Sequence, residues 1–257
     1  MPKIKVGVQI RPQHTTYADY AAAWVRADEL GADSLWNWDH FFPLSGDPDG
    51  PHFEGWTTLA ALGPLVKRAT VGNLVLAMSY RNPAHLSQMA KTLDHAMGGR
   101  LILGLGAGWA ERDYNEYGYE FGTAGDRLRN LERGLEIIKE RWAKDPPPPV
   151  NGRNVPILIG GSGEKVTLRI TAQHADLWNG FGPLDNFQRK NAILDEWCAK
   201  VGRDPAAIER TVRVDPPMFD QLDDFVAAGA THFICGGNAP FAFEELQQLI
   251  AWRDSRS

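Results

Sequence analysis

Hydrophobic residues follow two alternating periods along the chain, one typical of buried strands and one typical of amphipathic helices. Residues 4–10 carry an apolar side chain at every second position, which predicts a strand with one face packed on helices. After Thr16, a residue that can cap a helix, Tyr20, Trp24 and Ala27 recur on one helical face. The same alternation continues to the end of the chain. It predicts strands at residues 4–10, 33–38, 71–77, 101–106, 156–159, 175–179, 211–214 and 231–235, and helices at 16–31, 56–66, 82–97, 128–142, 164–174, 194–201, 222–226 and 243–252.

This order of elements predicts the fold class. Eight strands are expected, and seven of them are followed directly by a helix. Strand–helix alternation implies parallel strands joined by right-handed crossovers. Eight such units in 257 residues predict one (β/α)8 TIM-barrel domain over residues 1–257. A doubly wound open sheet is the alternative, but no GxGxxG fingerprint follows the first strand, where that fold would need it.

Composition narrows the class of protein. The formal net charge is −5 and no run of like charges is present, so a nucleic-acid partner is not expected. No segment has the length of a membrane span, and residues 1–10 lack the apolar core of a signal peptide, so we expect a cytoplasmic protein without a membrane partner. Cys198 and Cys235 lie far apart in different element types, which argues against a disulfide. The oligomeric state stays open, a homodimer included.

The fourth predicted strand ends in a glycine-rich run, at the end of the barrel where such folds place their chemistry. Gly104, Gly106 and Gly108 alternate inward, which predicts a gap where side chains would otherwise fill the barrel. Tryptophans at neighbouring strand ends supply aromatic walls suited to a flat ring system. These tryptophans are Trp36 or Trp38, Trp109 and Trp178. The alternative is that the tryptophans simply fill a wide barrel.

A second glycine-rich run follows the fifth predicted strand. Residues 160–163 read Gly-Gly-Ser-Gly and precede a predicted helix. Glycine lets backbone amides approach a ligand closely, and the free N–H groups of a first helical turn favour anions such as phosphate. The sequence therefore indicates a phosphate-binding loop. A plain turn that needs glycine for its dihedral angles is the alternative.

Asp39 and His40 form the only acid–imidazole pair at a predicted strand end. The alternative for this pair is a helix-capping aspartate beside a surface histidine. His52 and Glu54, in the loop that follows, are metal ligands by type but lack partners on neighbouring strands, so no metal site is expected. No GxSxG motif and no cysteine–histidine pairing supports nucleophilic catalysis.

Four segments together resemble one known family, the bacterial luciferase-like superfamily, and within it the oxidoreductases that use the deazaflavin coenzyme F420. The resemblance covers nearly the whole chain in the right order. The segments are Ser-Leu-Trp-Asn-Trp-Asp-His-Phe-Phe at 34–42, Tyr-Arg-Asn-Pro at 80–83, Arg-Leu-Ile-Leu-Gly-Leu-Gly-Ala-Gly-Trp at 100–109, and 157–179. It implies a barrel whose mouth holds the ring of the cofactor.

The resemblance also implies a set of cofactor-binding residues. Asp39 and His40 would lie near the ring, and a bulge at residues 74–77 would support its back face, with a cis peptide between Leu74 and Val75. The glycines of the fourth strand would line the ring and its side chain, and the loop at 160–163 would hold the phosphate. The full set is Asp39, Leu74, Val75, Ala77, Gly106, Ala107, Gly108, Gly160, Gly161, Ser162, Gly163 and Asn179.

Two departures from the family pattern are visible. Some deazaflavin enzymes carry a catalytic glutamate directly after the glycine motif of the fourth strand, where this chain has Trp109. Residues 144–155 are short and proline-rich where relatives have a longer insertion, a difference that could open the site or alter dimerisation.

The resulting hypothesis is an enzyme that moves hydride between coenzyme F420 and a small organic substrate, with His40 as the catalytic proton donor or acceptor. Lys165 and Arg169, just beyond the phosphate loop, could anchor the acidic tail of F420, which FMN lacks. The alternatives are an FMN-dependent two-component monooxygenase, a non-catalytic flavin-binding barrel and a metal-dependent barrel hydrolase. The sequence does not reveal the substrate.

Overall fold

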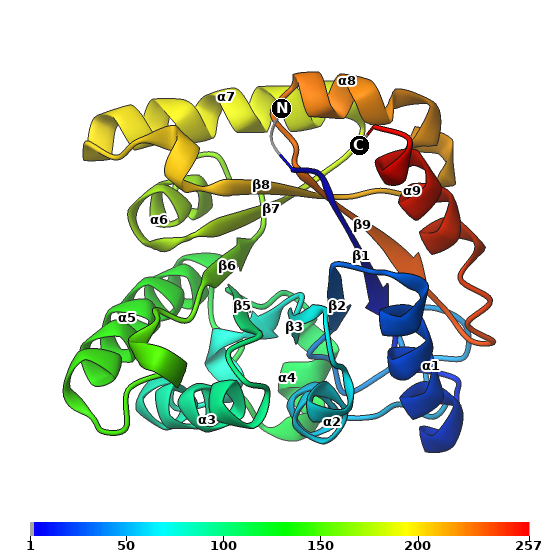
Figure 1. Cartoon of the computed structure of the whole chain (residues 1–257). Helices are drawn as coiled ribbons and strands as arrows, with labels where there is room; N and C mark the ends of the chain where they lie inside the picture. The colour runs from blue at the N-terminus through cyan, green and yellow to red at the C-terminus, as the bar shows by residue number, and fades with distance from the viewer. Residues whose placement is uncertain (1–2, 257) are drawn as a thin grey trace.

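The apolar segments form a closed parallel barrel wrapped by helices in the computed structural model, which describes residues 3–256 (Figure 1). The third predicted strand appears as two short pieces, β3 and β4, and counting them as one gives eight positions around the barrel. Pairing of β3 with β5 closes the ring. The strands are β1 (Lys5–Ile10), β2 (Ser34–Asn37), β3 (Thr70–Asn73), β4 (Leu76–Ala77), β5 (Leu101–Gly106), β6 (Ile157–Gly160), β7 (Leu177–Phe181), β8 (Glu209–Arg213) and β9 (His232–Gly237). The predicted TIM barrel is confirmed.

Four helices, α1, α2, α3 and α5, begin at a side chain that caps the first turn. Thr16 accepts a hydrogen bond from the backbone N–H of Asp19 at the start of α1, and Asn82 caps α3 in front of a proline. The helix predicted to start at 164 starts instead at Thr167, after a turn, and residues 111–117 form a helix that the pattern did not predict. The helices are α1 (Tyr17–Leu30), α2 (Gly55–Leu62), α3 (Pro83–Ala96), α4 (Glu111–Tyr117), α5 (Ala124–Lys144), α6 (Thr167–His174), α7 (Leu184–Val201), α8 (Leu222–Ala227) and α9 (Glu244–Asp254).

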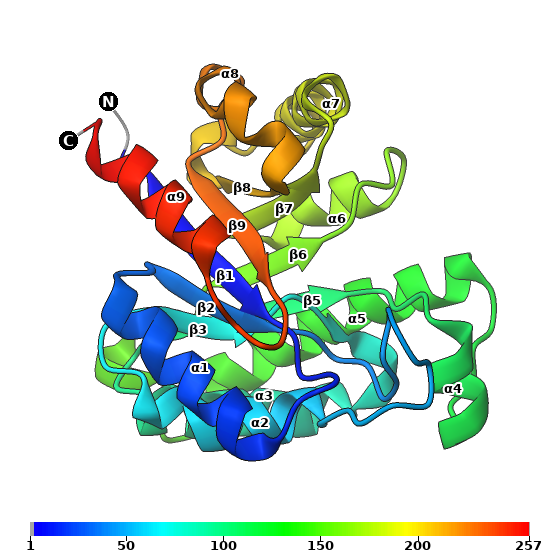
Figure 2. The ribbon, with the colours of Figure 1, turned by 90° about the vertical axis from the view of Figure 1, so that its right-hand side faces the viewer.

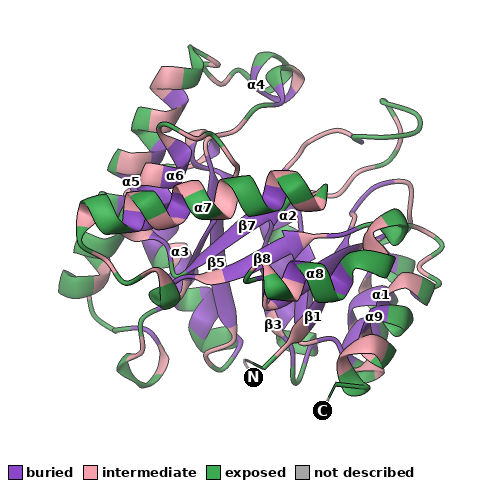
Figure 3. Ribbon diagram, turned by 90° about the horizontal axis from the view of Figure 1, so that it is seen from above, coloured by how far each residue is buried: buried purple, intermediate pink, exposed green. Residues whose placement is uncertain are grey.

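Two apolar layers hold the barrel together, because successive side chains of each strand point to opposite faces. The outward faces pack against the helices and form the main core, which is why the strands are buried along their length (Figure 3). The inward faces fill the barrel with Trp36, Leu74, Ile102, Leu158, Leu177 and Ile234. Among residues 3–256, none of the helices combines the length and apolar character needed to cross a bilayer. Cys198 and Cys235 are both buried and unpaired, as predicted.

The proline-rich segment at 144–155 lies at the N-terminal end of the barrel, away from the strand ends that carry chemistry. Arg153 pairs with the buried Asp94 of α3 and donates to the carbonyl of Leu101, the first residue of β5. Lys91 Nζ of α3 donates to the Asp145 carbonyl over 2.7 Å. The segment therefore does not open the site, because it is fixed to the opposite end of the barrel, and an effect on dimerisation stays open.

A polar network occupies this same N-terminal end, where four strands begin. Ser34 Oγ lies 2.6 Å from His232 Nε2 and accepts a hydrogen bond from Trp36 Nε1 over 2.7 Å. The other ring nitrogen of His232 lies 3.4 Å from Glu209 Oε1, and Lys5 Nζ lies 2.9 Å from Glu209 Oε2. Burial alone would raise the pKa of Glu209, but His232 and Lys5 outweigh it and hold the pKa at about 2.

We expect Glu209→Gln to lower the free energy of unfolding by about 2 kcal/mol at pH 7. The folded pKa is below the ordinary value of 4.5, so the unfolded chain binds the extra proton on acidification. The stabilisation is therefore complete above about pH 4.5 and disappears as the pH falls through about 2. Urea unfolding of both proteins from pH 7 to pH 3 measures it, with Glu29→Gln on the exposed face of α1 as control. If the difference in free energy of unfolding between wild type and Glu209→Gln does not shrink on acidification, the ionised Glu209 is not the source of the stabilisation.

Candidate active site

A cavity of about 450 Å³ opens at the C-terminal ends of the strands. This size is in the usual range for small-molecule and cofactor sites. All the predicted site residues except Ser162 and Gly163 contribute to its walls. The lining residues are Gln9, Trp38, Asp39, His40, Leu44, Leu74, Val75, Leu76, Ala77, Tyr80, Gly106, Ala107, Gly108, Trp109, Gly160, Gly161, Thr167, Asn179, Phe181 and Arg213.

The floor of the cavity is a bulge between β3 and β4. The peptide bond between Leu74 and Val75 is cis, as the family resemblance implies. Gln9 Nε2 donates to the Leu74 carbonyl over 2.6 Å and holds the bulge from the side of β1. Val75 extends from the bulge across the inside of the barrel, where it meets the glycines of the neighbouring strands.

The inward glycines accommodate this bulge, so Val75 fills part of the gap that the sequence predicts, while Gly106 and Gly108 still line the cavity. A Cβ at Gly104 would lie 1.9 Å from the Asn73 carbonyl oxygen, and a Cβ at Gly106 would lie 2.8 Å from the Val75 side chain. A Cβ at Gly160 would likewise lie 2.9 Å from the Val75 side chain. Gly108 has φ +84°, and a Cβ there would meet the Tyr114 hydroxyl. Val75, Gly106 and Gly160 together line the cavity and form an apolar platform.

Two of the four candidate tryptophans form the cavity wall, Trp38 and Trp109. Trp109 is 66% exposed and stands at the rim. Trp36 lies below the cavity in the barrel interior. Trp178 belongs to the outer layer, where it stacks on Phe187 and donates to the Gly161 carbonyl over 2.9 Å. The prediction that Trp178 lines the site is wrong, because the strand turns its neighbours Leu177 and Asn179 inward.

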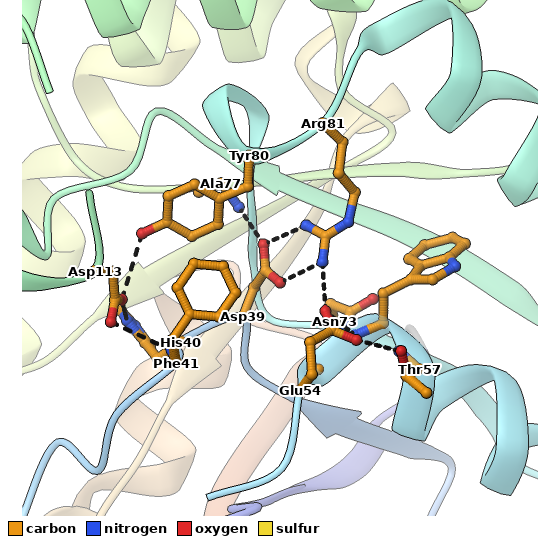
Figure 4. A network of polar contacts seen from close by, with 12 residues as sticks. Asp39, His40, Phe41, Glu54, Thr57, Asn73, Ala77, Tyr80, Arg81 and Asp113 are labelled. Atoms are coloured by element: carbon orange, nitrogen blue, oxygen red, sulfur yellow. Dashed lines mark hydrogen bonds and ion pairs between the residues drawn. The ribbon is translucent and has the colours of Figure 1, made fainter. Parts of the chain in front are cut away.

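Asp39 is buried and fully engaged with protein groups (Figure 4). Its Oδ2 accepts from the backbone N–H of Ala77 over 3.0 Å and from Arg81 Nη1 over 2.7 Å, and its Oδ1 accepts from Arg81 Nη2 over 2.8 Å. Arg81 also contacts Glu54 at 2.6 Å. Burial opposes the charge on Arg81, but Asp39 outweighs it and raises the pKa of the guanidinium. Asp39 therefore fixes β4, and so the platform, in place.

The alternative role of Asp39 as a helix cap is wrong, because Glu54 caps the helix that follows. Glu54 accepts hydrogen bonds from the backbone N–H groups of Trp56 and Thr57 at the start of α2. His52 accepts from Trp38 Nε1 over 2.9 Å, and burial together with the nearby His40 lowers the pKa of His52 to about 4. Both candidate metal ligands thus have structural partners. Within residues 3–256, no group of three or more His, Cys, Asp and Glu side chains is placed to hold a metal ion.

His40 forms a hydrogen-bonded pair with Asp113, a residue that the sequence pattern did not single out. His40 Nδ1 lies 2.7 Å from Asp113 Oδ2 (Figure 4). Asp113 also accepts from the Tyr80 hydroxyl over 3.3 Å and from the backbone N–H of Phe41 over 3.2 Å. Because Asp113 occupies Nδ1, the nitrogen that His40 has free is Nε2. The His40 ring also meets the edge of Trp109, with ring centroids 5.4 Å apart.

The helix that carries Asp113 stands beside the long loop after β2 (Figure 2). Arg112 joins the two elements by contacts to the Pro48 carbonyl and to Asp49. Burial, and next the Asp113 carboxylate, raise the pKa of Tyr80, so its hydroxyl remains a hydrogen-bond donor at neutral pH. Asp113 is thereby held in a buried position behind His40 by three contacts, with His40 Nδ1, the Tyr80 hydroxyl and the backbone N–H of Phe41.

The glycine loop at 160–163 lies between β6 and α6. Gly160 and Gly161 line the cavity, while Ser162 and Gly163 lie farther along the loop. Gly161 has φ +120°, a conformation that residues with a Cβ rarely adopt. Of the two candidate anchors beyond the loop, Arg169 is bound by Glu132 through contacts of 2.6 and 2.8 Å, so its assignment as a free anchor is wrong. Lys165 is exposed.

Comparison with known proteins places the chain in a family. Residues 3–253 match the luciferase-like monooxygenase family, and the chain belongs to it. A curated relative, the F420-dependent glucose-6-phosphate dehydrogenase of Amycolatopsis mediterranei, is 32% identical over 144 residues. That match covers 55% of this chain and 43% of the relative, so the chain spans less than half of the relative's length in the matched region.

Solved structures share the fold at low identity. An F420-dependent secondary alcohol dehydrogenase in complex with an F420–acetone adduct has a TM-score of 0.84 at 17% identity, covering 98% of both chains. The oxygenating constituent of 3,6-diketocamphane monooxygenase from Pseudomonas putida, in complex with FMN, has a TM-score of 0.64 at 17% identity. That match covers 82% of this chain and 67% of the other. These likenesses confirm the predicted luciferase-like barrel.

Proposed function

We propose that the protein is a single-domain oxidoreductase that transfers hydride between coenzyme F420 and a small organic substrate. The observation that carries this proposal is the cavity itself, which combines an apolar platform with an imidazole in its wall. Val75 and the facing glycines form the platform, and His40 lines the same cavity with Nδ1 bound to Asp113 and Nε2 free. The choice of cofactor is supported by curated relatives that are named F420-dependent glucose-6-phosphate dehydrogenases.

The residues present fit a flat ring with a phosphate-bearing tail. The platform offers an apolar face to the ring. Because Gly106, Gly160 and Gly161 have no side chains, the path from the platform to the glycine loop at 160–163 is open. The loop backbone at Gly161 is where we place the phosphate. When bound, the deazaflavin would supply the hydride chemistry, and the protein would supply orientation, exclusion of water and a proton path.

The proton path is the task of His40. Asp113 holds Nδ1, which fixes the ring orientation and leaves Nε2 to take a proton from the substrate hydroxyl or return one to a carbonyl oxygen. The negative charge of Asp113 also stabilises the imidazolium that forms. Since Trp109 stands where some deazaflavin enzymes have a glutamate, the pair of His40 and Asp113 carries the acid–base role without a second acid from that position.

The choice between F420 and FMN depends on what lies beyond the phosphate loop. F420 continues into an acidic tail, and basic side chains that the sequence did not single out lie near the loop. Lys190 Nζ contacts Glu164 at 2.7 Å, and Arg189 pairs with the same carboxylate. Both cations are already paired with Glu164, so the exposed Lys165 is the side chain at this edge that can anchor the acidic tail. The FMN-bound neighbour keeps a two-component monooxygenase as the second candidate. A cytoplasmic location is part of the proposal, and the oligomeric state stays open, a homodimer included.

We expect the protein to bind F420 with submicromolar affinity and FMN more weakly, as measured by cofactor fluorescence in parallel titrations. Gly161→Val should weaken F420 binding by about tenfold or more, because the side chain would occupy the space of the phosphate. Gly98→Val is the matched control, since Gly98 also has a positive φ, +62°, but lies after α3 at the other end of the barrel.

Turnover of alcohols with oxidised F420 separates an enzyme from a carrier. Tight FMN binding without F420 binding would overturn the proposal in favour of the monooxygenase. F420 binding that Gly161→Val and Gly98→Val weaken equally would place the phosphate elsewhere.

A further inference from the structure

We propose that the substrate carries an anionic group, and that Arg11 and Arg213 bind it at the mouth of the cavity. This inference rests on the proposed function, because it assigns the substrate side of the same site. Arg213 ends β8 and lines the cavity. Arg11 follows β1, and its guanidinium carbon lies 5.5 Å from the ring centroid of Trp38, which is also a lining residue.

The two guanidinium groups converge on one point above β9. A Cβ at Gly236 would lie 2.7 Å from Arg213 Nη2 and 3.2 Å from Arg11 Nη2. Glycine at this position therefore leaves room for both arginines to approach each other. Such proximity of like charges is unfavourable, and burial followed by the charge of Arg213 lowers the pKa of Arg11. An anion placed between the two groups would relieve this repulsion.

Arg11 and Arg213 lie on the side of the cavity opposite the platform, where the proposal places the substrate. Around the closed barrel, β8 stands four places from the combined β3–β4 position, so Arg213 faces the platform from the opposite wall. A ring lying on the platform would therefore turn its open face towards β8, β9 and β1. Phe181, the register partner of Arg213 on β7, lines the same wall and is 44% exposed. This wall is where a substrate stacked on the ring would extend.

The hydrogen-bond partners of Arg11 and Arg213 leave some of their N–H donors free. Arg213 Nη1 donates to the Val214 carbonyl, and Nη2 contacts Asp215 at 2.7 Å. Arg11 Nη1 donates to Asn238 over 2.8 Å, but its buried Nε has no hydrogen-bond partner. Within residues 3–256, the carboxylates that influence Arg11 act through their charge and not through a hydrogen bond.

Two carboxylates, those of Asp215 and Glu245, are close enough to offset part of the lowering of the Arg11 pKa. The Asp215 side chain is 52% exposed and is already bound to Arg213. Glu245, on α9, makes no ion pair with either arginine, and burial raises its pKa. Neither group fills the space at Gly236. A planar oxyanion, a carboxylate or a phosphate, matches the free donors, because guanidinium groups bind such groups in a bidentate manner.

The test compares two probes of the same shape, benzoate and the neutral benzamide. Both are titrated into the full-length protein with and without F420, and binding is followed by calorimetry. We expect benzoate to bind more tightly than benzamide, and Arg11→Gln and Arg213→Gln each to weaken benzoate about tenfold. Arg133→Gln, an exposed position on α5, is the matched control and should change nothing. Arg213→Lys keeps the charge if the glutamine variant fails to fold, and it should retain part of the affinity.

The outcomes separate this inference from the proposed function. Arginine-dependent benzoate binding by a protein that does not bind F420 would support the anion subsite and overturn the cofactor assignment. F420 binding together with benzoate affinity that is equal in wild type and both arginine variants would overturn the subsite alone. Equal affinity for benzoate and benzamide would overturn it as well.

Discussion

His40→Ala should lower turnover with F420 by about 10²- to 10⁴-fold while leaving cofactor affinity within about threefold of wild type. The loss follows from geometry, because the Nε2 of His40 is the free nitrogen at the cavity and Nδ1 is bound to Asp113 over 2.7 Å. The platform is independent of this side chain, since Asp39, Arg81 and Gln9 hold it. Steady-state kinetics and fluorescence titration measure the two quantities separately.

Asp113→Asn tests how the imidazole is held. We expect a lower kcat with little change in KM, because an amide can donate to Nδ1 and stabilise the wrong tautomer. His85→Ala, on the exposed surface of α3, is the matched histidine control. A His40→Ala variant of nearly full activity would reduce His40 to a residue of the cavity wall.

The barrel was predictable because it depends on periodicity. Each strand and most helices carry a local apolar pattern, and caps such as Thr16 and Asn82 mark where helices start. The third strand shows the limit of such reasoning. Residues 71–77 read as one continuous strand, and only the resemblance indicated the break between Leu74 and Val75.

The glycines at the strand ends were found correctly, but the sequence indicated only part of their role. An inward glycine looks the same in the sequence whether it leaves a cavity or admits another part of the chain. Gly104 and Gly106 admit the bulge, which comes from a segment thirty residues earlier, so the cause is a tertiary contact. The same limit applies to Trp178, because its face depends on the register of β7 with β6 and β8.

Partners that act across long sequence separations were missed. Asp113 lies 73 residues from His40, on a helix of seven residues whose apolar pattern is too short to recognise. Arg11 and Arg213 are a further case, since nothing local relates the end of β1 to the end of β8. Barrel closure brings them together at Gly236. Residue types at strand ends can therefore locate a site, whereas their pairing requires the three-dimensional structure.

Gly104→Ala should lower the free energy of unfolding by about 3–5 kcal/mol and abolish high-affinity F420 binding. The added Cβ would lie 1.9 Å from the Asn73 carbonyl oxygen, a backbone atom that cannot turn away as a side chain can. Relief requires β3 to move away from β5, and this movement displaces Val75 and the platform. Urea unfolding followed by far-UV circular dichroism measures the stability, and cofactor fluorescence measures the binding.

Gly125→Ala is the matched control for this substitution. Gly125 lies in the first turn of α5, where the nearest atom to a new Cβ is the flexible end of Arg129 at 3.3 Å. Alanine is favoured over glycine in a helix, so this variant should be as stable as wild type or more stable by up to about 1 kcal/mol. If Gly104→Ala is equally well tolerated, the carbonyl of Asn73 does not approach Gly104 and the bulge is not wedged between β3 and β5. If Gly104→Ala loses stability but keeps F420 affinity, the platform is not the surface on which the ring lies.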